Sequence, residues 1–179
     1  MSATPFRASP SRLNLFRLCR RKYWFEHVKR LGPKFRRPRP HLVMGAHIHE
    51  TLRLLYTRVP PDARNADVAE RILRRVWRRE RHGFAGPEEE REYGQRALAM
   101  IRRFCALTDL RVDPVATEDT HVLRVDERLW LTGRVDRVDE DAGGAFRVVD
   151  YKTGRRPAAA HDRPDQSLQA RIYASLVAA

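Results

Sequence analysis

The chain has 179 residues, of which 42% are hydrophobic and 8% aromatic, a composition that excludes a disordered polypeptide. Its 36 basic and 23 acidic residues give a net charge of +13, which favours a polyanionic partner, although a GC-rich genome would also enrich arginine. No apolar run reaches the roughly 18 residues that span a membrane. The first ten residues lack a signal-peptide core, so we expect a cytoplasmic protein that does not associate with membranes.

Helical spacing of apolar residues dominates the first 110 residues. Ser9 suits a helix N-cap and Pro10 the first helical position, so the first helix should begin there and stop at Gly32-Pro33. Acidic residues that follow Pro87 complement the dipole at the start of another helix. The pattern predicts further helices over about 42–57, 66–82 and from 87 through 105.

The periodicity changes near Pro114 to an alternating pattern rich in Val, Thr, Trp and Phe. It predicts three strands, over about 116–125, 129–138 and 145–152. Gly143-Gly144 suits a hairpin between the second and third strands. A polar loop follows, and a last helix runs from about Asp165 to the end. We expect a single domain, 1–179, with a helical part over about 9–110 and a sheet and final helix over about 114–179.

Three residues near the hairpin could support metal chemistry. Asp150 and Lys152 are two apart on the third strand and should point to one side, and Asp136 lies on the strand that pairs with it. Two carboxylates that approach each other repel unless a cation lies between them, and carboxylate oxygens suit Mg²⁺. A pair of surface carboxylates bridged to arginines is the alternative.

The two cysteines, Cys19 and Cys105, both lie in helix-like apolar patterns. Their number and separation indicate buried structural thiols rather than a disulfide framework or a four-cysteine metal site.

Four short patterns follow one another along the chain, and each is weak by itself. They are a GxxxH pattern at Gly45 and His49, a GxxD pattern at Gly133 and Asp136, the run Asp150-Tyr151-Lys152-Thr153-Gly154, and a QxxxY pattern at Gln169 and Tyr173. An N-terminal pattern precedes them, made by Ser9, Ser11, Leu13, Cys19, Lys22 and Tyr23. In this order they resemble the RecB-like nucleases of the PD-(D/E)xK superfamily, which include helicase-associated nuclease domains and CRISPR-associated exonucleases.

This resemblance implies an α/β fold with a restriction-endonuclease-like core, in which a mixed central sheet is flanked by helices, after an N-terminal helical region. It implies a metal-dependent DNA exonuclease of repair or recombination that hydrolyses phosphodiester bonds with one or two Mg²⁺ or Mn²⁺ ions. The implied metal ligands are His49, Asp136, Asp150 and the carbonyl of Tyr151. Lys152 would orient or deprotonate the attacking water, and Gln169 and Tyr173 would line the site. DNA, single-stranded or at duplex ends, is the implied substrate, and a helicase or other repair subunit the implied protein partner.

The chain departs from the resemblance in three places. Arg20 stands where a proline often follows the cysteine of the N-terminal helix. Some relatives bind an iron–sulfur cluster through one N-terminal and three C-terminal cysteines, but no cysteine follows Cys105, so no cluster is expected. The chain stops in or just after the QxxxY helix, where relatives commonly continue, which leaves three alternatives open: a C-terminally truncated fragment, a minimal form, or half of a larger protein. The competing hypothesis is a non-catalytic nucleic-acid-binding or helicase-docking module, against which the intact Asp136, Asp150 and Lys152 argue.

Overall fold

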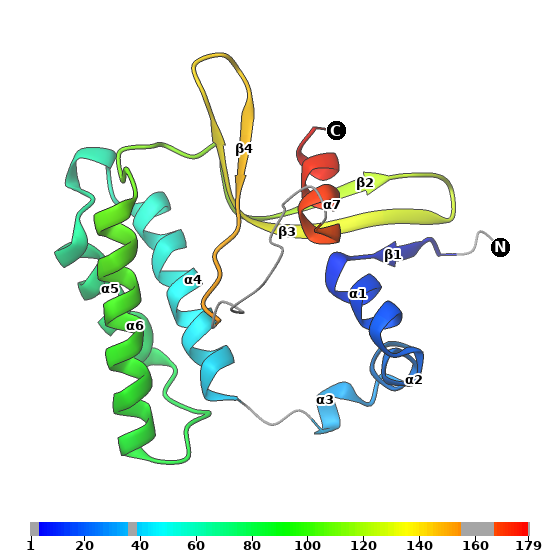
Figure 1. Ribbon diagram of the computed structural model, residues 1–179, viewed down its shortest axis with the longest axis horizontal. Helices are drawn as coiled ribbons and strands as arrows, with labels where there is room; N and C mark the ends of the chain where they lie inside the picture. The colour runs from blue at the N-terminus through cyan, green and yellow to red at the C-terminus, as the bar shows by residue number, and fades with distance from the viewer. Residues whose placement is uncertain (1–3, 36–38, 155–166, 179) are drawn as a thin grey trace. The chain divides into compact units, whose positions relative to one another are not determined.

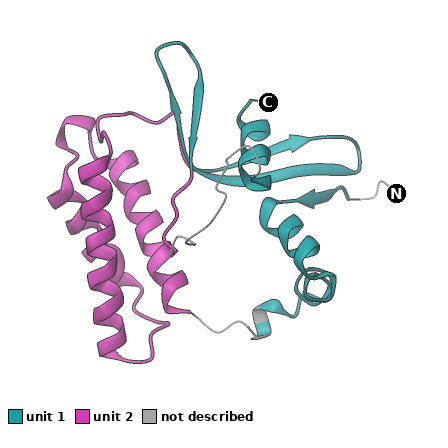
Figure 2. Ribbon diagram, viewed as in Figure 1, with its two compact units in different colours: residues 1–36, 118–149, 157–179 teal, residues 37–117, 150–156 magenta. Residues whose placement is uncertain are grey.

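The computed structural model describes residues 4–35, 39–154 and 167–178. It confirms the predicted fold class, because helices flank a mixed sheet (Figure 1). The chain forms two compact units (Figure 2): unit 1 comprises residues 1–36, 118–149 and 157–179, and unit 2 comprises residues 37–117 and 150–156. None of the described helices is long and apolar enough to cross a membrane.

The sheet of unit 1 is organised around one strand, β3 (Leu129–Glu140). β2 (Ala116–Arg124) lies beside it, and β1 (Phe6–Ala8) pairs with it in parallel, with Phe6 opposite Leu129. β4 (Phe146–Val149) pairs with β3 in the antiparallel direction, with Val149 opposite Arg137. Gly144 in the connecting turn has a φ of +80°, a left-handed conformation that glycine adopts without steric cost.

Two of the three predicted strands, over 116–125 and 129–138, match β2 and β3 to within two residues. The prediction for the third strand is wrong at its end, because β4 stops at Val149 and the segment from Asp150 to Lys152 leaves the ladder. β1 is a further strand that no sequence pattern indicated; its three residues are too few for alternation to be recognised.

The helix α7 (Leu168–Val177) packs on β3 because Gly133 has no side chain. A Cβ atom added at Gly133 would lie 2.8 Å from Leu176 Cδ1 and 2.9 Å from Tyr173 Cε1, closer than real contacts allow. The side chain of Ser167 caps the helix by accepting a hydrogen bond from the backbone N–H of Ala170. This helix confirms the last predicted helix; its expected start at Asp165 lies outside the described residues.

The first predicted helix, over 9–31, is divided into several elements in unit 1. Ser9 caps α1 (Pro10–Leu18) as predicted, accepting a hydrogen bond of 3.3 Å from the backbone N–H of Arg12. Cys19 then adopts an extended conformation, with a φ of −158°, and ends α1. The chain continues as α2 (Arg20–Tyr23), the π-helix η1 (Trp24–Val28) and α3 (Gly32–Phe35).

Unit 2 consists mainly of three helices whose positions the sequence predicted: α4 (Pro40–Arg58), α5 (Ala66–Arg79) and α6 (Pro87–Leu107). The short 3₁₀ helix η2 (Pro61–Ala63) was not predicted. The buried faces of α4, α5 and α6 form one cluster, made by Met44, Ile48, Leu52, Leu55, Ala69, Leu73, Ala97 and Ile101. Tyr151 packs against this cluster, and its ring lies edge-on to Phe104 at 5.5 Å. The chain leaves the β4 ladder after Val149, and the half-buried Tyr151 packs against the helices instead.

Prediction: Arg102→Gln should destabilise the protein at pH 7 and lose its effect in acid. Arg102 of α6 donates two hydrogen bonds to the Glu70 carboxylate of α5, and this bonding lowers the pKa of Glu70. A carboxyl group whose pKa is lower in the folded state than in the unfolded state stabilises the fold at pH values above its unfolded-state pKa. That stabilisation disappears as the pH falls through the folded-state pKa. Urea midpoints measured from pH 7 to pH 3 should therefore converge. Arg103→Gln, which removes an exposed arginine outside the described ion pairs, is the matched control.

Candidate metal centre and active site

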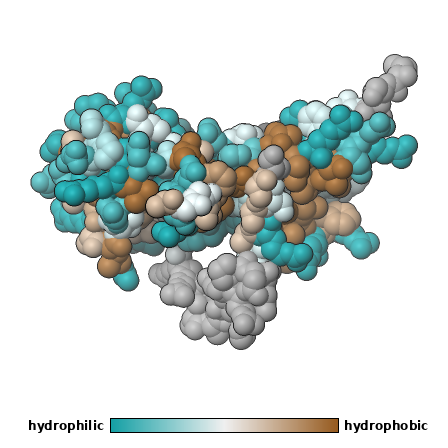
Figure 3. Space-filling model, turned by 90° about the horizontal axis from the view of Figure 1, so that it is seen from above, coloured by the Kyte–Doolittle hydropathy of each residue, from teal (hydrophilic) through white to brown (hydrophobic). Residues whose placement is uncertain are grey.

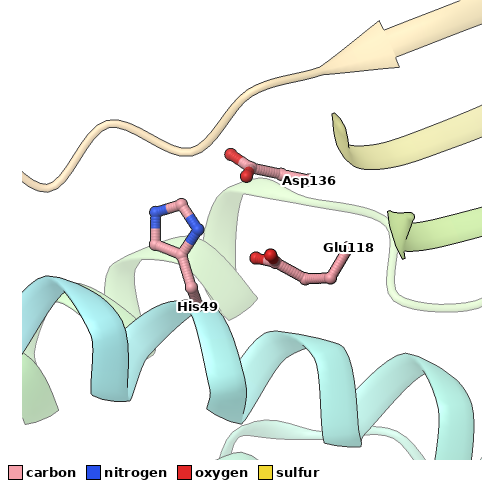
Figure 4. A group of neighbouring side chains, drawn as sticks. All are labelled: His49, Glu118 and Asp136. Atoms are coloured by element: carbon pink, nitrogen blue, oxygen red, sulfur yellow. The ribbon is translucent and has the colours of Figure 1, made fainter. Parts of the chain in front are cut away.

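Two carboxylates of unit 1 come together on the sheet. Asp136 of β3 is 8% exposed, and the side chain of Glu118, near the start of β2, is 9% exposed. A carboxylate oxygen of one lies within 4.8 Å of a carboxylate oxygen of the other. Figure 4 draws both acids, together with His49 of α4. Two half-buried or buried carboxylates at this separation repel each other, and a divalent cation between them would offset that repulsion.

Glu118 has an unusual backbone for a strand residue, with a φ of +52°. A residue with a Cβ atom in the left-handed region costs on the order of 1–3 kcal/mol, and such residues cluster at functional sites. Arg134, two residues before Asp136, places its Nε 2.9 Å from Glu118 Oε2. Sequence reasoning missed Glu118, because it is one of several acids between residues 118 and 127. Its place on the strand beside the GxxD strand is the signal that would have found it.

Gln169 and Tyr173 lie on α7, where Gln169 Nε2 donates a hydrogen bond of 3.0 Å to Tyr173 Oη. The Tyr173 ring contacts β3 on the side to which a Gly133 side chain would point. Side chains three residues apart on a strand point to opposite faces, so Asp136 points away from that side. The QxxxY pair therefore supports the strand that carries Asp136 from its other face.

In unit 2, His49 lies against the Asp-Tyr-Lys segment. Its Nε2 is 3.2 Å from the carbonyl oxygen of Tyr151, and the two rings meet edge-on at 5.7 Å. In an octahedral site with metal–oxygen distances of about 2.1 Å, adjacent ligand atoms lie about 3 Å apart. The His49 nitrogen and the Tyr151 carbonyl are within hydrogen-bond distance, and the same separation suits two neighbouring ligands of one divalent metal.

Asp150 and Lys152 also come together, although they lie outside the strand. Lys152 Nζ donates to Asp150 Oδ2 at 2.5 Å, and the Lys152 side chain is 70% exposed while that of Asp150 is 25% exposed. The predicted pairing of these two side chains is present, but it forms in the irregular segment beyond β4, where the half-buried Tyr151 packs against the helices, and not on a strand. Lys152 is thus an accessible cation held beside a half-buried carboxylate.

Gly45 explains how the Asp-Tyr-Lys segment reaches α4. A Cβ atom at Gly45 would lie 2.9 Å from Thr153 Oγ1, so a side chain at this position would displace Thr153. Gly45 and His49 are one helical turn apart and face the same segment, whose Tyr151 carbonyl approaches His49. The GxxxH pattern therefore has a direct physical meaning here: the glycine admits the segment and the histidine contacts it.

A hollow of about 580 Å³ lies elsewhere in unit 2, between α5 and α6, and contains none of the motif residues. Trp77 and four arginines are among its lining residues, with Arg74, Arg78, Arg81 and Arg91 at its edges. Glu90 accepts hydrogen bonds from Arg81 at 2.8 and 3.1 Å and from Trp77 at 3.1 Å, and the Arg81 bonding lowers the pKa of Glu90. The chemistry of the motif residues, rather than this concavity, locates the candidate active site.

A comparison with protein families identifies the class of protein. The sequence-family model of the PD-(D/E)XK nuclease superfamily matches residues 7–179, nearly the whole chain. The chain therefore belongs to this superfamily. No curated protein and no solved structure matches the chain. Membership suggests a metal-dependent nuclease, and the acidic and histidine side chains described above supply the donor atoms that a divalent metal needs.

Prediction: Gly45→Ala should destabilise the protein, and Thr153→Ala should rescue it. Alanine in a helix is intrinsically more favourable than glycine by about 1 kcal/mol. A loss of stability would therefore show that the clash with Thr153 Oγ1 outweighs the helix propensity of alanine. Thr153→Ala removes the clashing atom, and the double variant should be at least as stable as Thr153→Ala alone. Urea unfolding of all four proteins gives the coupling energy. Additive changes would mean that the close approach does not exist.

Proposed function

We propose that this protein is a metal-dependent deoxyribonuclease that hydrolyses phosphodiester bonds. The observation that carries the proposal is the carboxylate pair made by Glu118 of β2 and Asp136 of β3, in a chain that belongs to the nuclease superfamily. We further propose a RecB-like exonuclease that acts in cytoplasmic DNA repair or recombination, with a helicase or other repair subunit as its partner. The order of the four motifs supports this finer assignment.

We propose that the metal is Mg²⁺ or Mn²⁺ and name its candidate ligands within each unit separately. Unit 1 would supply Asp136 and, as an addition to the expected set, Glu118; unit 2 would supply His49, Asp150 and the Tyr151 carbonyl. Carboxylate, carbonyl and imidazole donors fit these two ions, and a second ion would use the remaining carboxylate oxygens.

A bound divalent metal would supply a water of lowered pKa and would offset charge on the phosphate being cleaved. The chain's own residues would provide the rest of the chemistry. Lys152 has an exposed ammonium group that would donate to the phosphate oxygens or orient the attacking water. Asp150 holds this ammonium group in place through their ion pair. The resemblance implies that Gln169 and Tyr173 line the site; we propose instead that they fix β3, and with it Asp136, from the opposite face.

Prediction: Asp150→Ala and Lys152→Ala should both abolish cleavage of labelled DNA with Mg²⁺ or Mn²⁺, and EDTA should abolish cleavage by the unmodified protein. Loss of a positioned charge or proton-transfer group commonly lowers a rate by about 10²- to 10⁴-fold. The two variants should differ in metal binding, because a carboxylate is a ligand and an ammonium group is not. Calorimetric Mn²⁺ titration should therefore show weaker binding for Asp150→Ala and little change for Lys152→Ala.

The matched controls are Asp119→Ala and Arg103→Ala, which remove an exposed acid and an exposed basic residue outside the motifs. Both controls should cleave DNA at the unmodified rate. Cleavage by Asp150→Ala at that rate would exclude this site. Salt-sensitive DNA binding by the unmodified protein, without cleavage under any metal condition, would instead indicate the non-catalytic binding module.

Prediction: Glu118→Gln should weaken Mn²⁺ binding by at least about tenfold while leaving the fold intact, as changes around metal ligands commonly do. The substitution keeps the size of the side chain and its place beside Arg134, but removes the charge that would face the metal. Glu127→Gln, an equal charge change at an exposed position in the turn between β2 and β3, is the control. Equal Mn²⁺ affinities of the two variants would remove Glu118 from the ligand set.

A further inference from the structure

Positive charge is concentrated in the N-terminal part of unit 1. The segment from Arg7 to Phe35 contains nine basic residues and one acidic residue, so it carries a net charge of +8 out of the +13 of the chain. Its acid, Glu26, lies 3.9 Å from Lys22. Arg20, Arg21 and Lys29 are exposed, and none of the three makes an ion pair with a carboxylate of the described residues. This part of unit 1 is therefore a strongly cationic surface.

Three large aromatic side chains are exposed on the same short helices. Phe16 is 43% exposed, Trp24 43% and Phe25 39%. Exposure of an apolar ring to water is unfavourable in proportion to the exposed area. Several exposed rings on neighbouring helices therefore indicate a binding surface. The space-filling view from above shows hydrophobic and hydrophilic residues mixed over the visible face (Figure 3).

Each of these rings has a cation over its face. The guanidinium carbon of Arg20 lies 5.3 Å from the Phe16 ring centre, that of Arg21 lies 5.9 Å from Phe25, and Lys29 Nζ lies 4.9 Å from Trp24. Cation–π attraction at these distances holds ring and charge side by side. A ligand that meets one of these rings therefore also meets a positive charge.

The π-helix η1 creates the third of these pairs. The Lys29 N–H donates to the Trp24 carbonyl at 2.9 Å, a hydrogen bond between residues five apart. In an α-helix, residues five apart point in different directions, because 3.6 residues make one turn. The wider π turn instead brings Lys29 over Trp24. Such turns are rare and are found frequently at functional sites.

We propose that Phe16, Arg20, Arg21, Trp24, Phe25 and Lys29 form a stacking platform that binds unpaired bases of single-stranded DNA outside the active site. Bases stack on the rings and phosphates lie against the cations, which is how proteins hold single strands without reading sequence. A duplex keeps its base faces stacked inside the helix, so it offers these rings nothing to stack on. The charge of +8 favours a polyanion over an apolar protein surface.

This inference rests on the proposed function in one respect: the choice of DNA as the nucleic acid. Its test therefore measures DNA binding under conditions that prevent cleavage. Fluorescence anisotropy of a labelled 30-nucleotide poly-dT strand and of a 30-base-pair duplex, in EDTA, gives both affinities. Trp24→Leu/Phe25→Leu keeps apolar bulk but removes the rings. It should weaken single-strand binding about tenfold or more and change duplex binding less than about twofold. Phe146→Leu removes an exposed ring outside the cation–ring pairs and should change neither affinity.

A second pair of variants tests the charges. Arg20→Gln/Arg21→Gln should weaken single-strand binding more than Arg71→Gln/Arg75→Gln, which removes the same charge from the exposed surface of α5. The Arg20→Gln/Arg21→Gln variant should also have a shallower dependence of log affinity on log salt concentration, with the magnitude of the slope reduced by about 1 to 2. Equal effects of the two charge pairs, equal losses on strand and duplex, or unchanged binding by the leucine variant would each overturn the platform.

The two proposals fail separately. If no metal condition gives cleavage but the leucine variant loses single-strand binding, the platform stands and the nuclease proposal falls. If Asp150 and Lys152 prove essential for cleavage but the leucine variant binds poly-dT normally, the nuclease proposal stands and the platform falls. Thermal unfolding midpoints of each variant, compared with the unmodified protein, confirm that the helices remain folded.

Discussion

β3 pairs with every other strand of its sheet, and its central residues are buried from Gly133 to Asp139, apart from Arg134. That burial requires α7 to come close to the strand, and α7 comes close only because Gly133 has no Cβ atom. The same approach determines where Asp136 lies. Once one face of β3 is closed by α7, the residue three positions further along must present its carboxylate on the other face, beside Glu118.

Unit 2 uses the same device on a helix. Gly45 allows Thr153 to approach the α4 backbone, and His49 then meets the carbonyl of Tyr151. Both motif glycines are therefore points of close packing, and each lies three or four residues before a side chain with a metal-binding group. Packing and chemistry are therefore assigned to different residues. The glycine allows a neighbouring segment to pack closely, and a residue three or four positions further along carries the metal-binding group.

Much of this could be predicted from the sequence, and the failures have physical causes. Long elements with regular burial, such as α4 and β3, were identifiable from apolar spacing alone. The end of β4 was not, because the position of Tyr151 depends on a cluster of side chains from α4, α5 and α6 that no local pattern reveals. The break at Cys19 and the π turn at Trp24 depend on backbone angles rather than on periodicity.

The candidate site divides in the same way. His49, Asp136, Asp150 and Lys152 were identifiable because their motifs are short and ordered along the chain. Glu118 was not, because it is one of several acids and its left-handed backbone, with a φ of +52°, departs from the regular strand that sequence patterns assume. An alternating pattern assumes a regular strand, so it cannot detect a residue whose direction comes from a departure from that regularity.

The pairing of β1 with β3 has a consequence for how the protein is made on the ribosome. Phe6 pairs with Leu129, so β1 cannot pair until the ribosome has added the next 123 residues. The helices α4, α5 and α6 contact one another over much shorter separations, and such local contacts form quickly. Folding during synthesis should therefore begin in the middle of the chain. The N-terminal helices, with their exposed rings and dense positive charge, would wait in an open nascent chain until the central strand emerges.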